Sequence, residues 1–188
     1  MKKRTNAPST KRFIAAIVIA IAIIGIIIYI TSAPGGPSYT NSAYGFSFNY
    51  PKGYTLSEMD MNTTSSPIVH VITLTPQTTT PPPKDSEGPP VIEAAVYNYS
   101  ATAATTTLVS WLADVSSTNF TLPNTTYATA TLTGNIPAVA YHWSGLYEGE
   151  SVAIANRNHA IIFSGMYVNP TDKIKSDFES IVSSLQIF

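Results

Sequence analysis

The chain has 188 residues, of which 11% are charged, a formal net charge of −1 and no cysteine. Without cysteine it forms no disulfide and offers no thiol nucleophile, so packing alone must stabilise its core. Five of the ten basic residues precede position 13 and all eleven acidic residues follow position 30, so the later part carries five basic and eleven acidic residues, a net charge of −6. An acidic domain without a basic cluster is a poor binder of nucleic acid, and we expect no nucleic-acid partner.

An uncharged apolar run from Phe13 to Ile30 follows the N-terminal basic residues. At 1.5 Å per residue, a helix of this length covers about 27 Å, close to the roughly 30 Å hydrocarbon core of a bilayer. Basic flanks of a membrane span stay in the cytoplasm. We therefore expect a single-pass protein of the cell membrane whose C-terminal domain is extracytoplasmic. Its segments are a cytoplasmic basic segment at 1–12, a transmembrane helix at 13–31, a flexible linker at 32–42 and one domain at 43–188.

Two alternatives to this anchor remain open. A cleaved secretory signal has a similar basic start, but its apolar region usually has 7–15 residues, and here the candidate cleavage motif at 31–33 is followed by Pro34. A pilin-like structural subunit also begins with an apolar helix and continues into an α+β domain. The Gly-Phe processing site and early Glu typical of pilins are absent from this chain.

The first half of the domain predicts three strands. Aromatic residues alternate with small or polar ones from Tyr44 to Tyr50, which is typical of a half-buried strand, and Pro51 ends it. Further strands are predicted at 69–75 and 91–99. Between them, the segment 76–90 contains six prolines and predicts an extended loop, either a tolerated insertion or a polyproline-type docking segment for a partner.

The second half predicts a short helix, four strands and a C-terminal helix. Leu108, Trp111, Leu112 and Val115 form one apolar stripe, with Thr106 or Thr107 as the N-cap. Strands are predicted at 125–133, 138–144, 151–155 and 159–167.

The last helix is predicted to begin with Asn169 as the N-cap and Pro170 in the first turn. Its apolar face consists of Ile174, Phe178, Ile181, Val182 and Leu185. The order of strands and helices, without regular βαβ units, indicates an α+β domain with a mainly antiparallel sheet.

Several segments resemble PsbP-like domains. The residues from Tyr44 to Pro51 read YGFSFNYP, the turn at 134–138 reads GNIPA, and the chain closes with a helix and SLQIF at 184–188. The resemblance covers about residues 43–188 and implies the Mog1/PsbP fold, an α/β/α sandwich with a central antiparallel sheet. It also implies an accessory or assembly protein without catalytic activity. No binding residue of the family is carried over by position.

The sequence offers little catalytic chemistry. His70, His142 and His159 each lie in a predicted strand, where an inward imidazole bonded to its neighbours is the ordinary interpretation. Glu148 and Glu150 flank Gly149 and are expected to be solvated. No metal-ligand motif, nucleophile elbow or phosphate loop occurs, so we expect no enzyme, metal or cofactor.

Tyr141, Trp143 and Tyr147 are the candidate binding residues, because the first two share a strand face and the third follows in the next turn. Aromatic residues also serve cross-strand packing, so these side chains could equally belong to the core. The leading hypothesis is a membrane-anchored, non-enzymatic interaction module for an envelope protein. The alternatives are a module that binds a cell-envelope glycan or peptide, and the pilin-like subunit; any small-molecule ligand stays unknown.

Overall fold

The computed structural model describes residues 36–61, 66–77, 88–100 and 107–188. Its main feature is a seven-stranded sheet in which every neighbouring pair of strands is antiparallel. Across the sheet the strands are β3 (Tyr54–Asp60), β4 (Ile68–Pro76), β5 (Ile92–Asn98), β9 (His159–Tyr167), β8 (Glu148–Asn156), β7 (Ile136–Ser144) and β6 (Thr126–Leu132). The predicted antiparallel sheet is confirmed.

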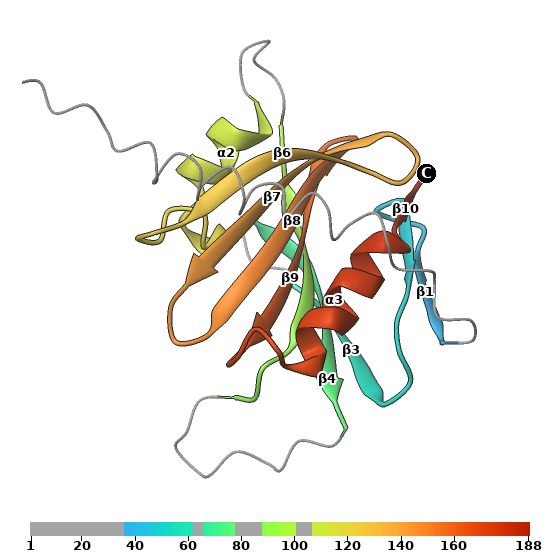
Figure 1. Cartoon of the computed structure of the whole chain (residues 1–188). Helices are drawn as coiled ribbons and strands as arrows, with labels where there is room; N and C mark the ends of the chain where they lie inside the picture. The colour runs from blue at the N-terminus through green and yellow to red at the C-terminus, as the bar shows by residue number, and fades with distance from the viewer. Residues whose placement is uncertain (1–35, 62–65, 78–87, 101–106) are drawn as a thin grey trace, which may run out of the picture.

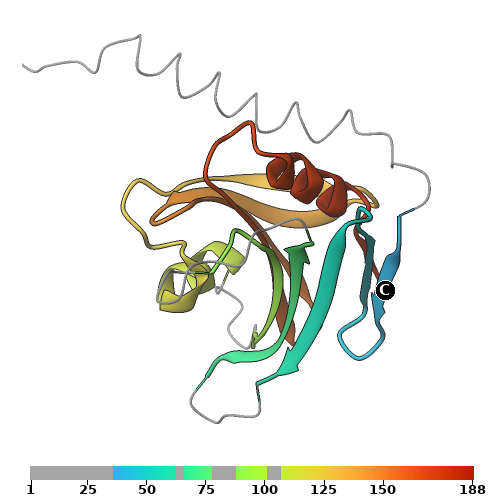
Figure 2. The same cartoon turned by 90° about the horizontal axis from the view of Figure 1, so that it is seen from below.

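The inner strands of this sheet carry buried side chains on both faces, since successive side chains of a strand point to opposite sides. On the inner strand β5, Ala94 and Val96 pack with helix α3 (Lys173–Ser183), whereas Ala95 and Tyr97 pack with helix α2 (Leu108–Asp114). The short 3-10 helix η1 (Ser116–Thr118) follows α2. Figure 2 shows α3 on one side of the large sheet and α2 on the other. We call these two sides the α3 face and the α2 face.

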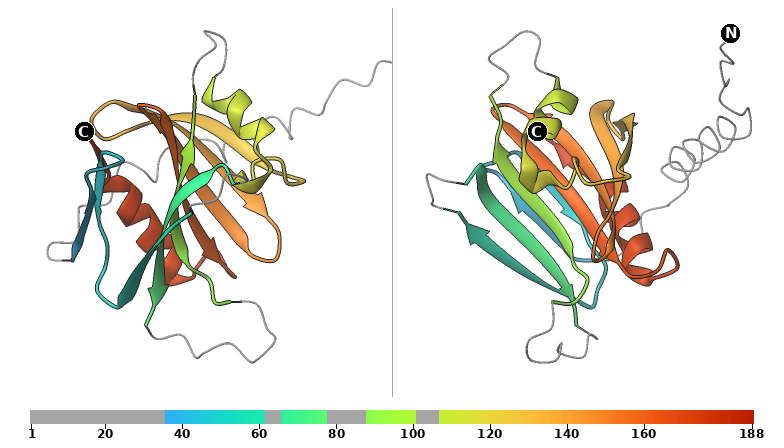
Figure 3. Two further views of the ribbon diagram at one scale, coloured as in Figure 1. Left: turned by 180° about the vertical axis from the view of Figure 1, so that it is seen from behind. Right: turned by 90° about the vertical axis from the view of Figure 1, so that its left-hand side faces the viewer.

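A second, three-stranded sheet lies beside α3 (Figure 3). Its order is β1 (Ser38–Asn41), β2 (Phe46–Asn49) and β10 (Gln186–Ile187), and both pairs are antiparallel. The predicted aromatic alternation is confirmed in β2, where Phe46 and Phe48 meet the ring of Phe163 edge-on at 5.9 and 5.6 Å. These contacts attach the small sheet to the α3 face.

The structure differs from the expected elements in several places. Residues 38–41, expected in the linker, form β1, because their backbone pairs with β2. Strand β3 was not predicted, since most of its side chains are exposed and its alternation is weak. Helix α3 begins at Lys173, later than the predicted cap at Asn169, because the Asp172 carboxylate accepts the backbone N–H groups of Val168 and Asn169.

Helix α2 has the predicted cap, since the Thr107 side chain accepts the N–H of Ser110. Within the described part of the chain, no helix is long and apolar enough to cross a membrane. The expected transmembrane segment 13–31 and most of the proline-rich loop 76–90 lie outside the described residues.

Candidate functional site: a histidine–carboxylate cluster between the two sheets

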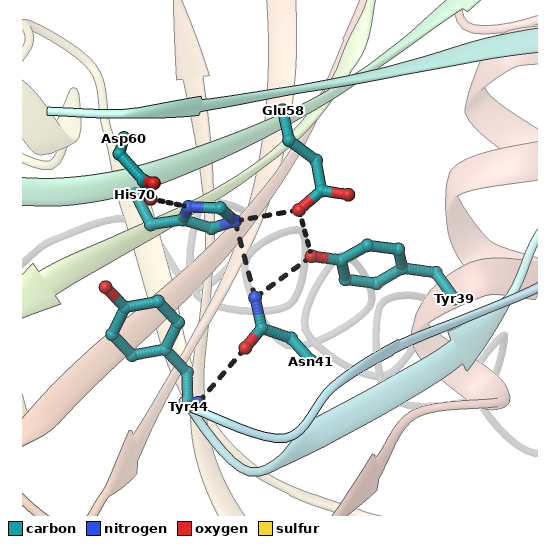
Figure 4. Close-up of polar contacts among 6 residues, drawn as sticks. All are labelled: Tyr39, Asn41, Tyr44, Glu58, Asp60 and His70. Atoms are coloured by element: carbon teal, nitrogen blue, oxygen red, sulfur yellow. Dashed lines mark hydrogen bonds and ion pairs between the residues drawn. The ribbon is translucent and has the colours of Figure 1, made fainter.

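A cluster of polar side chains joins the small sheet to the edge of the large sheet (Figure 4). Its members are Tyr39 and Asn41 of β1, Tyr44 of the following turn, Glu58 and Asp60 of β3, and His70 of β4. The register of the β3–β4 pair places Asp60 directly opposite His70. Glu58 lies two residues earlier, so its side chain points to the same face of the sheet.

His70 is the centre of this cluster and is only 5% exposed. Its Nδ1 lies 2.7 Å from Asp60 Oδ1, and its Nε2 lies 3.3 Å from Glu58 Oε2 and 3.3 Å from Asn41 Nδ2. The two carboxylates are much more exposed, at 45% for Glu58 and 68% for Asp60. A buried imidazole is therefore held between two solvated carboxylates.

The other contacts of the cluster fix the orientation of Asn41. The backbone N–H of Tyr44 donates to Asn41 Oδ1 at 3.1 Å, so the amide nitrogen must face Tyr39 and His70. That nitrogen donates to Tyr39 Oη at 3.0 Å, and Tyr39 Oη donates to Glu58 Oε2 at 2.9 Å. Burial raises the pKa of Tyr39 to about 12, and the Glu58 carboxylate adds to this rise. Tyr39 therefore stays a neutral hydrogen-bond donor at physiological pH.

This geometry allows two hydrogen-bond states for His70. A neutral ring accepts from Asn41 at Nε2, whereas a protonated ring donates to Asp60 and Glu58 together. The Asp60–His70 pair resembles the acid–base half of a hydrolytic triad, in which the far nitrogen of the ring holds a nucleophile. Here that nitrogen faces an amide and a carboxylate. Among the described residues, no group of three His, Cys, Asp or Glu side chains could hold a metal ion.

The predicted binding residues Tyr141 and Trp143 lie inside the protein on the α2 face. They are 3% and 5% exposed. Tyr141 Oη donates to the carbonyl of Thr118 at 2.7 Å, and Trp143 Nε1 donates to Ser151 Oγ at 2.9 Å. Burial raises the pKa of Tyr141 above its usual range. These two rings share a strand face as expected, but they offer no exposed aromatic surface on which a ligand could stack.

Tyr147 lies apart from these two rings, in the turn between β7 and β8, and is half-buried. Its hydroxyl donates to the carbonyl of Gly88 at 2.6 Å. The expected solvated pair, Glu148 and Glu150, also has partners: Glu148 lies 3.0 Å from His142 Nε2, and Glu150 lies 3.0 Å from Lys175 Nζ. Tyr141 and Trp143 are thus buried on the α2 face, Tyr147 contacts Gly88, and the two glutamates form ion pairs with other residues. The structure does not bring the predicted binding residues together into one site.

His70 lies in a strand as an inward, hydrogen-bonded imidazole, and this prediction is confirmed. Its partners Glu58 and Asp60 were not predicted. Their i, i+2 spacing on a strand was the available signal, but many exposed strands carry such a pair. The hairpin register that brings Asp60 to His70 cannot be read from that spacing.

Three large apolar side chains are exposed at one end of the large sheet. Tyr127 at the start of β6 is 56% exposed, Leu146 in the β7–β8 turn is 66% exposed, and Val168 after β9 is 59% exposed. The strand registers place the start of β6, the end of β7, the start of β8 and the end of β9 at this same end. We call these three residues the apolar rim.

No family model and no curated protein sequence matches the chain. Solved structures do match. The solution structure of cyanobacterial PsbP (CyanoP) from Synechocystis sp. PCC 6803 aligns with a TM-score of 0.50 and 14% identity, covering 86% of this chain and 99% of that one. A crystal structure from Bacteroides thetaiotaomicron VPI-5482 aligns with a TM-score of 0.49 and 12% identity, covering 81% of this chain and 48% of that one. At 14% identity the first similarity concerns the fold alone, and the fold of this chain is PsbP-like.

Proposed function

We propose that this protein is a membrane-anchored, non-enzymatic accessory domain that binds another protein of the cell envelope. The observation that carries the proposal is a PsbP-like fold in a chain whose N-terminus reads as a basic segment and a transmembrane helix at 13–31. Members of the family that the sequence resembles are commonly exported or membrane-attached accessory proteins. A photosynthetic role is not carried over, because the anchor and linker replace the N-terminal extension through which photosynthetic members act.

The histidine–carboxylate cluster supports a non-enzymatic role. A catalytic base needs a free nitrogen directed at a substrate or nucleophile. The ring of His70 is buried, and both of its nitrogens lie within hydrogen-bond distance of Asp60, Glu58 or Asn41. The cluster therefore suits the attachment of β1 to β3 and β4 better than it suits catalysis.

The apolar rim supports a protein partner. Protein-binding surfaces combine apolar or aromatic side chains with few charges at their centre. Tyr127 and Leu146 belong to the segment 115–147, which contains no Asp, Glu, Lys or Arg in a domain that is otherwise acidic. We assign the part of the rim formed by Leu146 and Val168 as the surface that faces the partner.

Crosslinking in the membrane tests this function. A photoreactive residue would replace Leu146 or, in a second variant, Val168 in the full-length chain, and crosslinked products would be identified by mass spectrometry. Asn158, exposed in the β8–β9 turn at the opposite end of the sheet, is the matched control position. A chain without residues 1–31 shows whether the anchor is needed.

We expect one envelope protein to be captured reproducibly from Leu146 and Val168 and not from Asn158. Capture of glycan alone would contradict the proposal and favour the module that binds an envelope ligand. Capture of only further copies of this chain through the rim would contradict it and favour a structural subunit.

A further inference from the structure

Strand β6 is an open edge of the large sheet. It pairs with β7 along one side, and among the described residues no other backbone group forms a hydrogen bond with it. Figure 1 shows β6 along the outer margin of the sheet. The unpaired N–H and C=O groups of such an edge form a template for another strand.

Natural proteins usually protect an edge with charges, proline, a bulge or a covering segment. The opposite edge, β3, carries Glu58 and Asp60, and it is tied to β1 through the cluster described above. Strand β6 reads TYATATL, without charge or proline, and its register with β7 runs through seven consecutive pairs without a shift. Strand β6 is therefore protected neither by a charge, nor by a proline, nor by a bulge.

We propose that β6 pairs antiparallel with β6 of a second copy of this chain, with Thr129 at the two-fold axis. In this register Thr129 faces Thr129 of the second copy, Ala128 faces Ala130, and Tyr127 faces Thr131. All pairs stay on matching faces, because the side-chain period of a strand is two. Each of these pairs is favourable across neighbouring strands: two alanines are small, tyrosine packs on the β-branched threonine, and two threonines can face each other. No like charges meet, although the domain as a whole is acidic.

Two copies that are anchored in the same membrane can form this pair. This part of the argument rests on the proposed function, which includes the membrane anchor. Antiparallel edge pairing has its two-fold axis normal to the sheet, so the α3 faces of both copies lie on the same side. The first described residue, Gly36, lies against Tyr50 next to β2, whose aromatic residues pack on that face. The described part of each chain therefore begins on the same side of the paired sheets. Anchoring in one membrane also raises the effective concentration of the second copy, which compensates for a small interface.

The absence of cysteine makes disulfide trapping a clean test. Thr129→Cys, Tyr127→Cys and Thr131→Cys would be introduced singly into the full-length chain and oxidised in the membrane. Met59→Cys on β3 is the control, because Met59 is 62% exposed on the other edge. Directly opposite Cβ atoms lie 4.5–5.5 Å apart, whereas equal positions two residues from the axis lie about 13 Å apart. We expect Thr129→Cys to form the dimer and the other three variants to form roughly tenfold less.

A mixture of chains carrying Tyr127→Cys and Thr131→Cys provides the second measurement, because these positions face each other in the proposed register. The mixture should crosslink well although neither chain does so alone. Adding Thr129→Lys to both should abolish this crosslink, since like charges would then meet at the axis, whereas adding Met59→Lys should not. An unchanged melting temperature shows that each variant is folded.

Equal crosslinking of Thr129→Cys and Met59→Cys would overturn the pairing of two copies, as would resistance to Thr129→Lys. Capture of a different protein by Thr129→Cys would also overturn it while leaving the accessory function intact. Conversely, a Thr129 dimer without any partner captured from the rim would support the pairing and contradict the accessory function.

Discussion

Replacing Gly149 by alanine should destabilise the protein through the buried tryptophan. The indole of Trp143 lies directly over Gly149, where an added Cβ would overlap its Cε2 and Cζ2 atoms. The ring cannot move aside freely, because it is 5% exposed and its Nε1 donates to Ser151 Oγ at 2.9 Å. Gly149→Ala therefore forces either a strained backbone or a displaced ring.

The expected loss of unfolding free energy follows from the overlap with the Trp143 ring and from the hydrogen bond between Trp143 and Ser151. Overfilling a packed core costs about 1–3 kcal/mol. Loss of the buried hydrogen bond to Ser151 would add about 1 kcal/mol. A total of about 2–4 kcal/mol corresponds to a melting temperature lower by roughly 5–15 °C for a domain of this size.

Thermal unfolding of the full-length chain, followed by circular dichroism, measures this effect. Gly145→Ala is the matched control, because a Cβ at Gly145 in the neighbouring turn meets nothing within 4 Å. In a Trp143→Leu background, Gly149→Ala should cost much less, since the overlapping ring is gone. Equal melting temperatures for Gly149→Ala and Gly145→Ala would refute the reasoning.

Two further predictions concern partly buried titratable groups. Tyr54→Phe should lower the free energy of unfolding by about 1–2 kcal/mol, because Tyr54 Oη donates to the buried carboxylate of Asp177 at 2.8 Å. Tyr127→Phe, at an exposed tyrosine, is the control, and an equal loss in both variants would contradict this prediction. Burial raises the pKa of Tyr54, so its contribution should also be lost as the pH rises above about 10, where the unfolded chain ionises first. Burial raises the pKa of Glu93 as well, so its charged form opposes folding at neutral pH and not in acid. Glu93→Gln should therefore raise the melting temperature at pH 7 and by clearly less at pH 4, and an equal effect at both would exclude this cause.

Local patterns determined much of the fold. The aromatic alternation of β2 and the apolar stripes of α2 and α3 are readable because each depends on the period of a single element. The strands from β6 to β9 were readable for the same reason, since each alternates or forms an apolar run between clear turns. The charge-free composition of β6 is likewise a property of the sequence alone.

Tertiary structure decided which of these side chains are available for function. Tyr141 and Trp143 carry the same aromatic pattern whether exposed or buried, and only the position of η1 and the neighbouring strands buries them. The histidine–carboxylate cluster depends on the β3–β4 register and on a contact between Asn41 and His70, which lie 29 residues apart. Such contacts arise from the packing of distant segments, and no local period encodes them.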